Sequence, residues 1–325
     1  MKAIVWTKYG PPEVLVLRDI AKPQPKDSEI RIKIHATTAF PGDCETRALK
    51  FPKVFQLLFR LLFGLFKPRG TKILGQELAG EIESVGKSVT RFKLGDKVFG
   101  NTGLHFGAYA QYVCLHEKAD IALIPIGISY AQAAALPTGG MNALHFVRLG
   151  KIQRGEKVLI NGAGGSIGTT AIQLIKALEA EVTVVDSTGK LDTLLSLGAD
   201  KAIDYTQQNF NDNGERYDVI FDVVGKSNHQ TCIKQLNPGG RYLLANSILN
   251  QTAKAKRACK HTDKQVISTA AQHNSEDLVY LAGLVEAGKL SVVIDSSYPL
   301  EQVVEAHLYV DSAVKTGQVV LTVSH

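Results

Sequence analysis

Hydrophobic and polar residues alternate along the first third of the chain. In the segment 29–36, Ile30, Ile32 and Ile34 alternate with polar residues, which is the period of a strand with one buried face. Glycine and proline turns, as at 10–13 and 22–28, separate such segments. Short strands joined by turns predict an antiparallel, barrel-like domain over residues 1–124.

The pattern changes near residue 129 to apolar segments that alternate with helical ones. Such alternation predicts a parallel, doubly wound sheet of the Rossmann type, here over residues 125–265. The expected strands are 157–160, 181–185, 201–205, 217–224 and 241–246, and the expected helices are 168–178, 190–197 and 227–236.

The last sixty residues predict a return to the first domain. Segments 275–289 and 300–313 have amphipathic helical patterns, and 317–323 (GQVVLTV) has the pattern of a strand. We expect this strand to join the first domain, so that about 266–325 completes it. The fold class is therefore α/β, with a Rossmann-type sheet and a β-barrel domain.

The apolar segment 54–66 (VFQLLFRLLFGLF) has thirteen residues with Arg60 in the middle. A bilayer span needs about 20 apolar residues, so no integral span is expected. The pattern predicts a helix packed on the body of the protein. Two alternatives are a flap beside an apolar substrate pocket and a peripheral contact with a membrane.

Composition adds limits on location and partners. The 325 residues carry a net charge of +6, spread along the chain. The densest basic run, 254–264, has no aromatic platform beside it, so a solvated face is expected and nucleic-acid binding is not. The four cysteines form no CxxC pair, and the N-terminus lacks the apolar core of a signal peptide. Both features predict a cytoplasmic protein with reduced thiols.

A glycine-rich loop follows the strand at 157–161. Gly162, Gly165 and Gly168 form a GxxGxxG pattern before a helical segment, and a second strand ends at Asp186. In such a βαβ unit, glycines let the backbone approach a pyrophosphate at the helix N-terminus. We therefore predict dinucleotide binding, against the alternative of a tight turn alone. The predicted contacts are Asn161, Gly162, Gly164, Gly165, Ser166, Ile167 and Gly168.

Several longer motifs together resemble the medium-chain dehydrogenases/reductases, in their zinc-free quinone oxidoreductase branch. They are ILGQELAGEIESVGKSVTRFKLGDKVFG at 73–100, FGAYAQYV at 106–113 and INGAGGSIGTTAIQLIKAL at 160–178. The resemblance covers nearly the whole chain. It implies a GroES-like barrel and a dinucleotide-binding domain, with nicotinamide and substrate meeting between them. It also implies a homodimer.

Zinc-dependent relatives carry a catalytic cysteine and a Gly-His-Glu sequence. Phe40 stands at the cysteine position, and Gln76 replaces the histidine between Gly75 and Glu77. Neither side chain is a zinc ligand of the usual N or S type, so we expect no metal. The resemblance then implies NAD(P)H-dependent reduction of an electrophilic small molecule, a quinone or an α,β-unsaturated carbonyl. The alternative is a catalytically weak dinucleotide-binding redox sensor or interaction protein.

The candidate substrate pocket is defined by resemblance and by the unassigned segment 51–68. It comprises Phe40, Arg47 and Phe55, with Asp43 as the candidate catalytic residue. Many relatives have Asn where Phe40 stands, and a tyrosine common shortly after the aspartate is missing. For Asp43 and Arg47 the alternative is a satisfied polar group: Arg47 would then pair with an acid.

Two sets of residues indicate different cofactors, NAD and NADP. Asp186 ends the second strand of the βαβ unit, where an acid accepts hydrogen bonds from the ribose of NAD. Ser187, Lys190 and Tyr205 match the positions at which zinc-free relatives bind the 2′-phosphate of NADP. We expect NADP(H), with NAD(H) as the alternative. Three further residues are carried over by resemblance to the cofactor site: Thr138, Val224 and Asn246.

Overall fold

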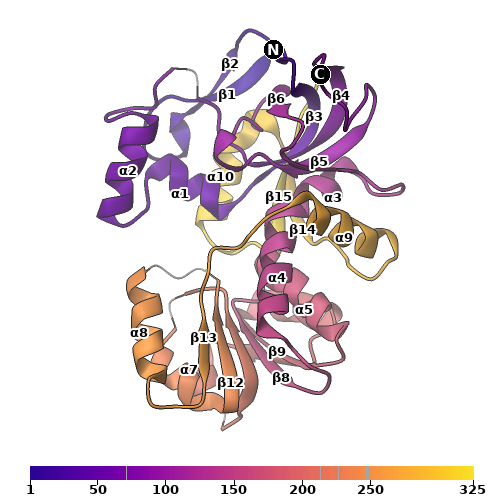
Figure 1. Ribbon diagram of the computed structural model, residues 1–325. Helices are drawn as coiled ribbons and strands as arrows, with labels where there is room; N and C mark the ends of the chain where they lie inside the picture. The colour runs from indigo at the N-terminus through magenta and orange to yellow at the C-terminus, as the bar shows by residue number, and fades with distance from the viewer. Residues whose placement is uncertain (71, 213, 226, 246–248) are drawn as a thin grey trace. The chain divides into compact units, whose positions relative to one another are not determined.

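The chain folds into two compact units (Figure 1). The structure is a computed structural model that describes residues 1–70, 72–212, 214–225, 227–245 and 249–325. Unit 1 comprises Met1–Pro137, Asn274–Glu286 and Val293–His325, and unit 2 comprises Thr138–His273 and Ala287–Val292. The first boundary thus lies at Pro137, later than the expected 124, because helix α3 (Tyr130–Ala135) packs on strands of unit 1.

Unit 1 contains a seven-stranded sheet with the strand order β14-β15-β3-β4-β5-β7. The seventh strand, β6, pairs with β3. The alternating segment identified in the sequence forms the long strand β3, in which Ile30, Ile32 and Ile34 are fully buried. The C-terminal strand β15 pairs with β3 in antiparallel fashion, so the predicted return to the first domain is confirmed. The strands are β3 (Glu29–Ala39), β4 (Glu77–Val85), β5 (Lys97–Asn101), β6 (Tyr112–His116), β7 (Asp120–Leu123), β14 (Ile294–Pro299) and β15 (Gln318–Thr322).

A separate antiparallel pair and four further helices complete unit 1. Strands β1 (Lys2–Trp6) and β2 (Leu15–Asp19) pair with each other. Helix α1 contacts α10, and α9 lies against β7. The apolar segment 54–66 is helical, as predicted, over most of its length. The helices are α1 (Pro41–Ala48), α2 (Lys53–Phe63), α9 (Ser275–Glu286) and α10 (Val303–Asp311).

Unit 2 contains a six-stranded parallel sheet in the order β10-β9-β8-β11-β12-β13. Numbered along the unit this is 3-2-1-4-5-6, the order of a doubly wound dinucleotide-binding fold, as predicted. The strand order reverses between β8 and β11, and ligands bind such sheets at the carboxyl ends of these strands. The strands are β8 (Lys157–Asn161), β9 (Glu181–Asp186), β10 (Lys201–Asp204), β11 (Tyr217–Asp222), β12 (Leu236–Leu244) and β13 (Gln265–Ile267).

The helices of unit 2 are α4 (Pro137–Gly150), α5 (Ser166–Lys176), α6 (Leu191–Ser196), α7 (His229–Gln235) and α8 (Leu249–Cys259). Figure 1 shows α7 and α8 beside β12 and β13, which they contact. Helix α5 packs on β8 and β9 through an apolar face that includes the fully buried Ile172 and Ile175. Within the described part of the chain, no helix combines the length and apolarity needed to cross a membrane.

Candidate functional site

The glycine loop joins β8 to α5 and is shaped for close approach by a ligand. Gly162 has φ +82°, a conformation that favours glycine, and Gly165 is the N-cap of α5. A Cβ built on Gly165 would have no neighbour within 4 Å, so open space lies over this residue. Because glycine has no side chain, the first N–H groups of this eleven-residue helix have no N-cap side chain to donate to. This combination suits an anion such as pyrophosphate.

Asp186, at the end of β9, points under this loop. Its Oδ2 accepts a hydrogen bond from the Gly164 N–H at 2.7 Å, and its Oδ1 accepts one from the Ser187 N–H at 2.9 Å. Lys190 Nζ lies 3.3 Å from the same Oδ1. Both charged side chains are buried, and a Cβ on Gly164 would lie 2.5 Å from Lys190 Cδ. The carboxylate therefore braces the loop, and its two oxygens already have donors.

The ends of β9 and β10 bring the remaining selectivity candidates together. Asp186 is in register with Asp204, and the Tyr205 N–H donates to the Asp186 carbonyl at 3.1 Å. The Thr188 hydroxyl donates to the Asp204 carboxylate, which ties the two chain segments to each other. Tyr205 remains largely exposed. Ser187, Lys190 and Tyr205 thus lie at one edge of the sheet, beside the glycine loop.

Two other predicted residues also lie next to the loop. A Cβ on Gly162 would lie 2.4 Å from Val224 Cγ2, so Val224 covers this glycine. Thr138 begins the part of α4 in unit 2, and the following Gly139 packs so closely on α5 that an added Cβ would lie 2.6 Å from Ser166 Cβ. The N-termini of α4 and α5 therefore meet.

Two further residues predicted for the cofactor site are Asn161 and Asn246. The Asn161 amide donates to Asp222 Oδ1 at 3.2 Å and to Ser227 Oγ at 2.8 Å, so it links the ends of β8 and β11. Its side chain thus has a structural role, and its contact with the cofactor stays a prediction. Asn246 lies outside the described residues.

The candidate catalytic region of unit 1 is a buried polar network between α1 and α10. Asp43, Arg47, Tyr109 and His307 are all nearly or fully inaccessible to solvent. Tyr109 donates to Asp43 Oδ2 at 2.9 Å, and its oxygen lies 3.0 Å from His307 Nε2. Arg47 Nη1 lies 2.7 Å from His307 Nδ1, and Arg47 Nη2 forms a 2.7 Å ion pair with Asp311. These contacts connect three separate parts of the sequence.

The Arg47 guanidinium determines which atoms of this network donate and which accept hydrogen bonds. A guanidinium only donates, so His307 Nδ1 must accept, and the neutral ring then carries its hydrogen on Nε2. The Nε2–H of His307 then donates to the Tyr109 oxygen, and the Tyr109 hydroxyl donates to Asp43 Oδ2. Burial and the Arg47 charge lower the pKa of His307 to about 3, consistent with a neutral ring. Burial also raises the pKa of Asp43 well above its usual range.

This network corrects the predictions for the substrate pocket. Arg47 does not line a pocket: its Nε donates to the Gly10 carbonyl at 3.2 Å and its Nη atoms contact His307 and Asp311. The alternative, a pair with an acid, is confirmed. Asp43 is fully buried against Tyr109, so in this structure it is placed to act through its neighbours.

The two aromatic candidates, Phe40 and Phe55, have different surroundings. The Phe40 ring packs on the backbone of Gly42, where an added Cβ would lie 2.6 Å from its edge. Phe55 is on the outward side of α2 and 38% exposed. Neither is among the residues that line the pocket of about 570 Å³ in unit 1 that is described below. A substrate-pocket wall that includes Phe40 and Phe55 therefore stays a prediction.

Sequence reasoning missed Tyr109, His307 and Asp311. The only local signal was that His307 and Asp311 are four residues apart in an apolar helical segment, which puts two polar side chains on one helix face. Their partners are about 260 positions away, as the Arg47–His307 separation shows. Nothing in the local pattern indicates that pairing.

The network predicts a specific pH dependence of stability. The folded-state pKa of His307 is about 3, against about 6.5 in an unfolded chain, so the unfolded state binds the extra proton between these values. The His307 contribution is therefore fully present above pH 6.5 and declines as the pH falls. It should decrease by about 3 kcal/mol between pH 7 and pH 4.

The measurement is the free energy of unfolding in urea across that range, for the native protein and for His307→Gln. Taking the difference between the two proteins is necessary because the raised pKa of Asp43 acts in the opposite direction: protonation in the folded state stabilises the fold as the pH falls. A difference that does not vary with pH would contradict a buried neutral histidine.

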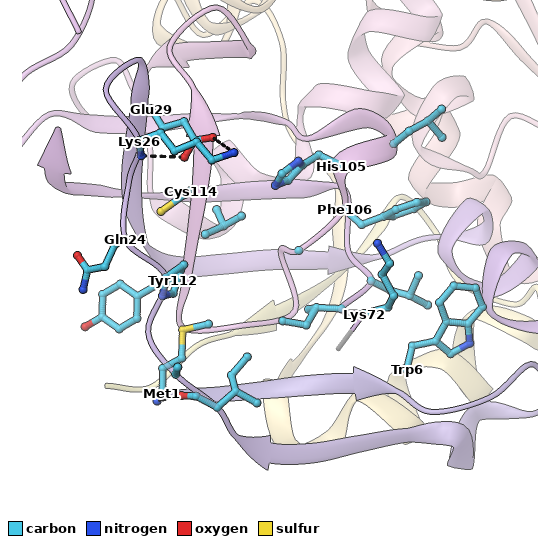
Figure 2. Close-up of a pocket in the computed structure, with 18 of the residues that line it drawn as sticks. Met1, Trp6, Gln24, Lys26, Glu29, Lys72, His105, Phe106, Tyr112 and Cys114 are labelled. Atoms are coloured by element: carbon cyan, nitrogen blue, oxygen red, sulfur yellow. Dashed lines mark hydrogen bonds and ion pairs between the residues drawn. The ribbon is translucent and has the colours of Figure 1, made fainter. Parts of the chain in front are cut away.

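Unit 1 also contains a separate pocket of about 570 Å³ (Figure 2). Trp6, Phe63 and Phe106 form part of its apolar wall, and the Lys26–Glu29 pair lies on the other side. Burial raises the pKa of the Cys114 thiol to about 11, so it is a poor nucleophile at neutral pH. The pocket contains none of the predicted site residues. We assign it no role in catalysis.

No group of three His, Cys, Asp or Glu side chains that could hold a metal ion occurs among the residues that the structure describes. Phe40 contributes a hydrocarbon ring, and Glu77, the acid of the Gly75-Gln76-Glu77 sequence, accepts hydrogen bonds from Thr38 and Gln318. The donor set is therefore unlike that of a zinc site.

Comparison with known proteins gives matches over almost the whole chain. Residues 26–126 match the family model described as alcohol dehydrogenase GroES-like domain, and residues 197–321 match that described as zinc-binding dehydrogenase. The chain is 32% identical over 335 residues to 2-methylene-furan-3-one reductase of Solanum lycopersicum, covering 99% of this chain and 79% of that protein. It is 31% identical over 334 residues to the chloroplastic NADPH-dependent alkenal/one oxidoreductase of Arabidopsis thaliana, with the same coverage.

A solved structure is similar throughout. The quinone oxidoreductase from Coxiella burnetii superimposes with a TM-score of 0.89 at 30% identity, over 100% of this chain and 99% of that one. Both unit 1 and the parallel sheet of unit 2 thus have counterparts in a single known protein.

Proposed function

The chain belongs to the medium-chain dehydrogenases/reductases, in their quinone oxidoreductase-like branch, and from this premise we propose that it is an NADPH-dependent oxidoreductase. The proposed acceptor is a quinone or an α,β-unsaturated carbonyl, the compound classes named in its relatives. NADPH supplies the hydride. The chain's own residues bind and orient the cofactor and exclude water.

The observation that carries the proposal is the glycine loop with Asp186 beneath it. The open space over Gly165 and the N-terminus of α5 would accept the pyrophosphate. Asp186 holds the loop from below through the Gly164 N–H, which keeps the cradle rigid before the cofactor arrives. Thr138, at the adjoining end of α4, is proposed to contact the nicotinamide half.

Preference for NADPH is supported by the same geometry. The Asp186 carboxylate accepts hydrogen bonds from the Gly164 and Ser187 N–H groups, and the Lys190 ammonium lies 3.3 Å from its Oδ1, so its charge is already balanced within the chain. Lys190, Ser187 and Tyr205 lie at the neighbouring edge, where an ammonium and two hydroxyls would receive the 2′-phosphate. We propose these three as the selectivity residues.

Lys190→Ala is expected to weaken NADPH binding by about 10- to 100-fold, because a charge-assisted contact to phosphate contributes roughly 1.5–3 kcal/mol. Binding of NADH should change by less than threefold, because NADH lacks the 2′-phosphate. Both affinities can be measured by titrating the fluorescence of the reduced nicotinamide. An equal loss for the two cofactors would mean that Lys190 only braces Asp186, to which it is paired.

Zinc-independent chemistry is the second part of the proposal. Without a Lewis acid at the acceptor oxygen, an acceptor that is already electrophilic is favoured over a simple alcohol. The test is NADPH oxidation with an ortho-quinone and with an enone, in protein whose metal content is measured before and after chelation. Turnover that survives chelation supports the proposal. Tight NADPH binding without turnover would favour the redox-sensor alternative.

A further inference from the structure

Helix α2 presents its apolar side to solvent. Its inward residues, Gln56, Phe59, Arg60 and Phe63, recur at helical spacing and are at least partly buried. Its outward residues are almost all aliphatic: Val54, Leu57, Leu58, Leu61 and Leu62 are 57–80% exposed. The helix is therefore arranged in the opposite sense to an ordinary surface helix, which buries its aliphatic stripe.

The inward side explains how α2 is anchored. The Phe63 ring packs against Trp6 and Phe106, with ring centroids 6.1 and 5.7 Å apart. Arg60 lies over the Tyr9 ring at 5.0 Å, and its guanidinium also donates to the Leu65 carbonyl. Gln56 Nε2 donates to the Phe51 carbonyl at 2.8 Å, so both polar side chains of the helix centre help to hold it in place. The aliphatic side takes no part in this anchoring.

The apolar surface continues beyond the helix. Leu65 and Phe66 follow α2 and are 45% and 89% exposed. In Figure 1, α2 stands at the periphery of unit 1. Each exposed leucine that left water would contribute roughly 1.5–3 kcal/mol, so the face is costly to leave uncovered.

The charge around this face has one sign. Every charged residue from position 46 to 76 is Lys or Arg. Arg47 and Lys50 contact Asp311, whereas Lys53, Lys67 and Arg69 are exposed around the apolar face. An apolar helix face with a basic border is the pattern of a segment that lies in the headgroup region of an anionic bilayer.

We propose that α2, with Leu65, Phe66 and the basic residues that flank them, is a docking surface for an anionic lipid membrane. The helix would lie in the plane of the membrane, with its leucines at the acyl boundary and its cations against lipid phosphates. Charge favours this occupant over a second copy, because two copies would bring the same cations together. The inference goes beyond the proposed reductase activity and does not depend on it.

The first test is sedimentation of the full-length protein with vesicles of phosphatidylglycerol and phosphatidylcholine, or of phosphatidylcholine alone. We expect binding to the anionic vesicles, at least a tenfold decrease with the neutral ones, and a further decrease as salt is raised. Failure to bind the anionic vesicles at low salt would overturn the proposal.

Matched variants locate the contact. Leu57→Gln/Leu61→Gln, at the centre of the outward face, should reduce vesicle binding at least tenfold while thermal unfolding stays unchanged. The control is Leu94→Gln/Ile126→Gln, which replaces two residues that are 67% and 92% exposed elsewhere in unit 1 and should bind like the native protein. Equal binding by the α2 variant would overturn the assignment to this helix.

Charge and self-association are tested separately. Lys67→Ala/Arg69→Ala should weaken binding to anionic vesicles more than Lys87→Ala/Lys93→Ala, which removes the same charge from another exposed segment. Equal losses would mean that only net charge matters and would overturn a defined surface. If the native protein forms a dimer that Leu57→Gln/Leu61→Gln dissociates, and no vesicles are bound, the face is a contact between copies and the lipid proposal is wrong.

Discussion

Replacing Arg47 by methionine is expected to destabilise unit 1 by about 3–5 kcal/mol, the usual cost of removing one partner of a buried ion pair. Arg47 is 1% exposed, and its guanidinium contacts Asp311, His307 and the Gly10 carbonyl. Methionine has a similar length, so the loss comes mainly from unpaired polar groups rather than from a cavity. Urea unfolding followed by circular dichroism measures the effect.

Lys50→Met is the matched control. Lys50 contacts the other oxygen of the same Asp311 at 3.2 Å, but its side chain is 59% exposed. Its loss should cost less than about 1 kcal/mol, because water screens an exposed pair. If both variants lost the same small amount, the buried network would not be what holds α1 to α10.

Gly165→Val is expected to reduce NADPH affinity at least 100-fold, about 3 kcal/mol. The valine side chain would occupy the open space at the N-cap of α5 where the pyrophosphate is proposed to bind. The backbone there is extended, with φ −82°, so valine can adopt it. The fold should lose no more than about 1 kcal/mol, the scale of an unfavourable N-cap residue.

Two further glycines separate binding from folding. A Cβ on Gly168 would lie 2.4 Å from the Ala163 carbonyl oxygen, so Gly168→Ala must shift the loop and should lower stability and affinity together. Gly283→Ala, in α9, adds a methyl group where nothing lies within 4 Å, so it should leave NADPH affinity unchanged and raise stability by up to about 1 kcal/mol, because alanine favours a helix interior over glycine. Unchanged NADPH binding by Gly165→Val, with the fold intact, would remove the loop from the proposed cofactor site. Titration and thermal unfolding of the three variants provide the comparison.

Much of the fold could be predicted because its signals are local. The alternation of Ile30, Ile32 and Ile34 with polar residues requires only the geometry of a strand, and β3 has these residues buried. The βαβ unit from Lys157 to Asp186 combines two apolar strands with a helical period and a glycine turn. The boundary at Pro137 was less accessible, because it depends on α3 packing on strands far away in the sequence.

The candidate site likewise has features that could be predicted from the sequence and features that could not. The glycine loop was identified from its spacing between a strand and a helix. Ser187, Lys190 and Tyr205 were carried over from the resemblance to zinc-free relatives. The orientation of the Asp186 side chain could not be predicted from the sequence. That orientation decides whether the carboxylate faces the ribose or the Gly164 N–H. The contact with Gly164 at 2.7 Å exists only once the loop is folded.

By itself, the sequence determined the two-part architecture and the glycine turn between strand and helix, because strand and helix periods and glycine turns are properties of short segments. The resemblance placed Phe40 and Gln76 at the positions of zinc ligands, and neither side chain is of the usual donor type. Only the tertiary structure decided that Arg47 is buried against His307 and Asp311, and that α2 turns its leucines outward. Both outcomes depend on which surfaces distant segments cover. A helical pattern shows that a face is apolar, but what lies against that face is decided by the rest of the chain.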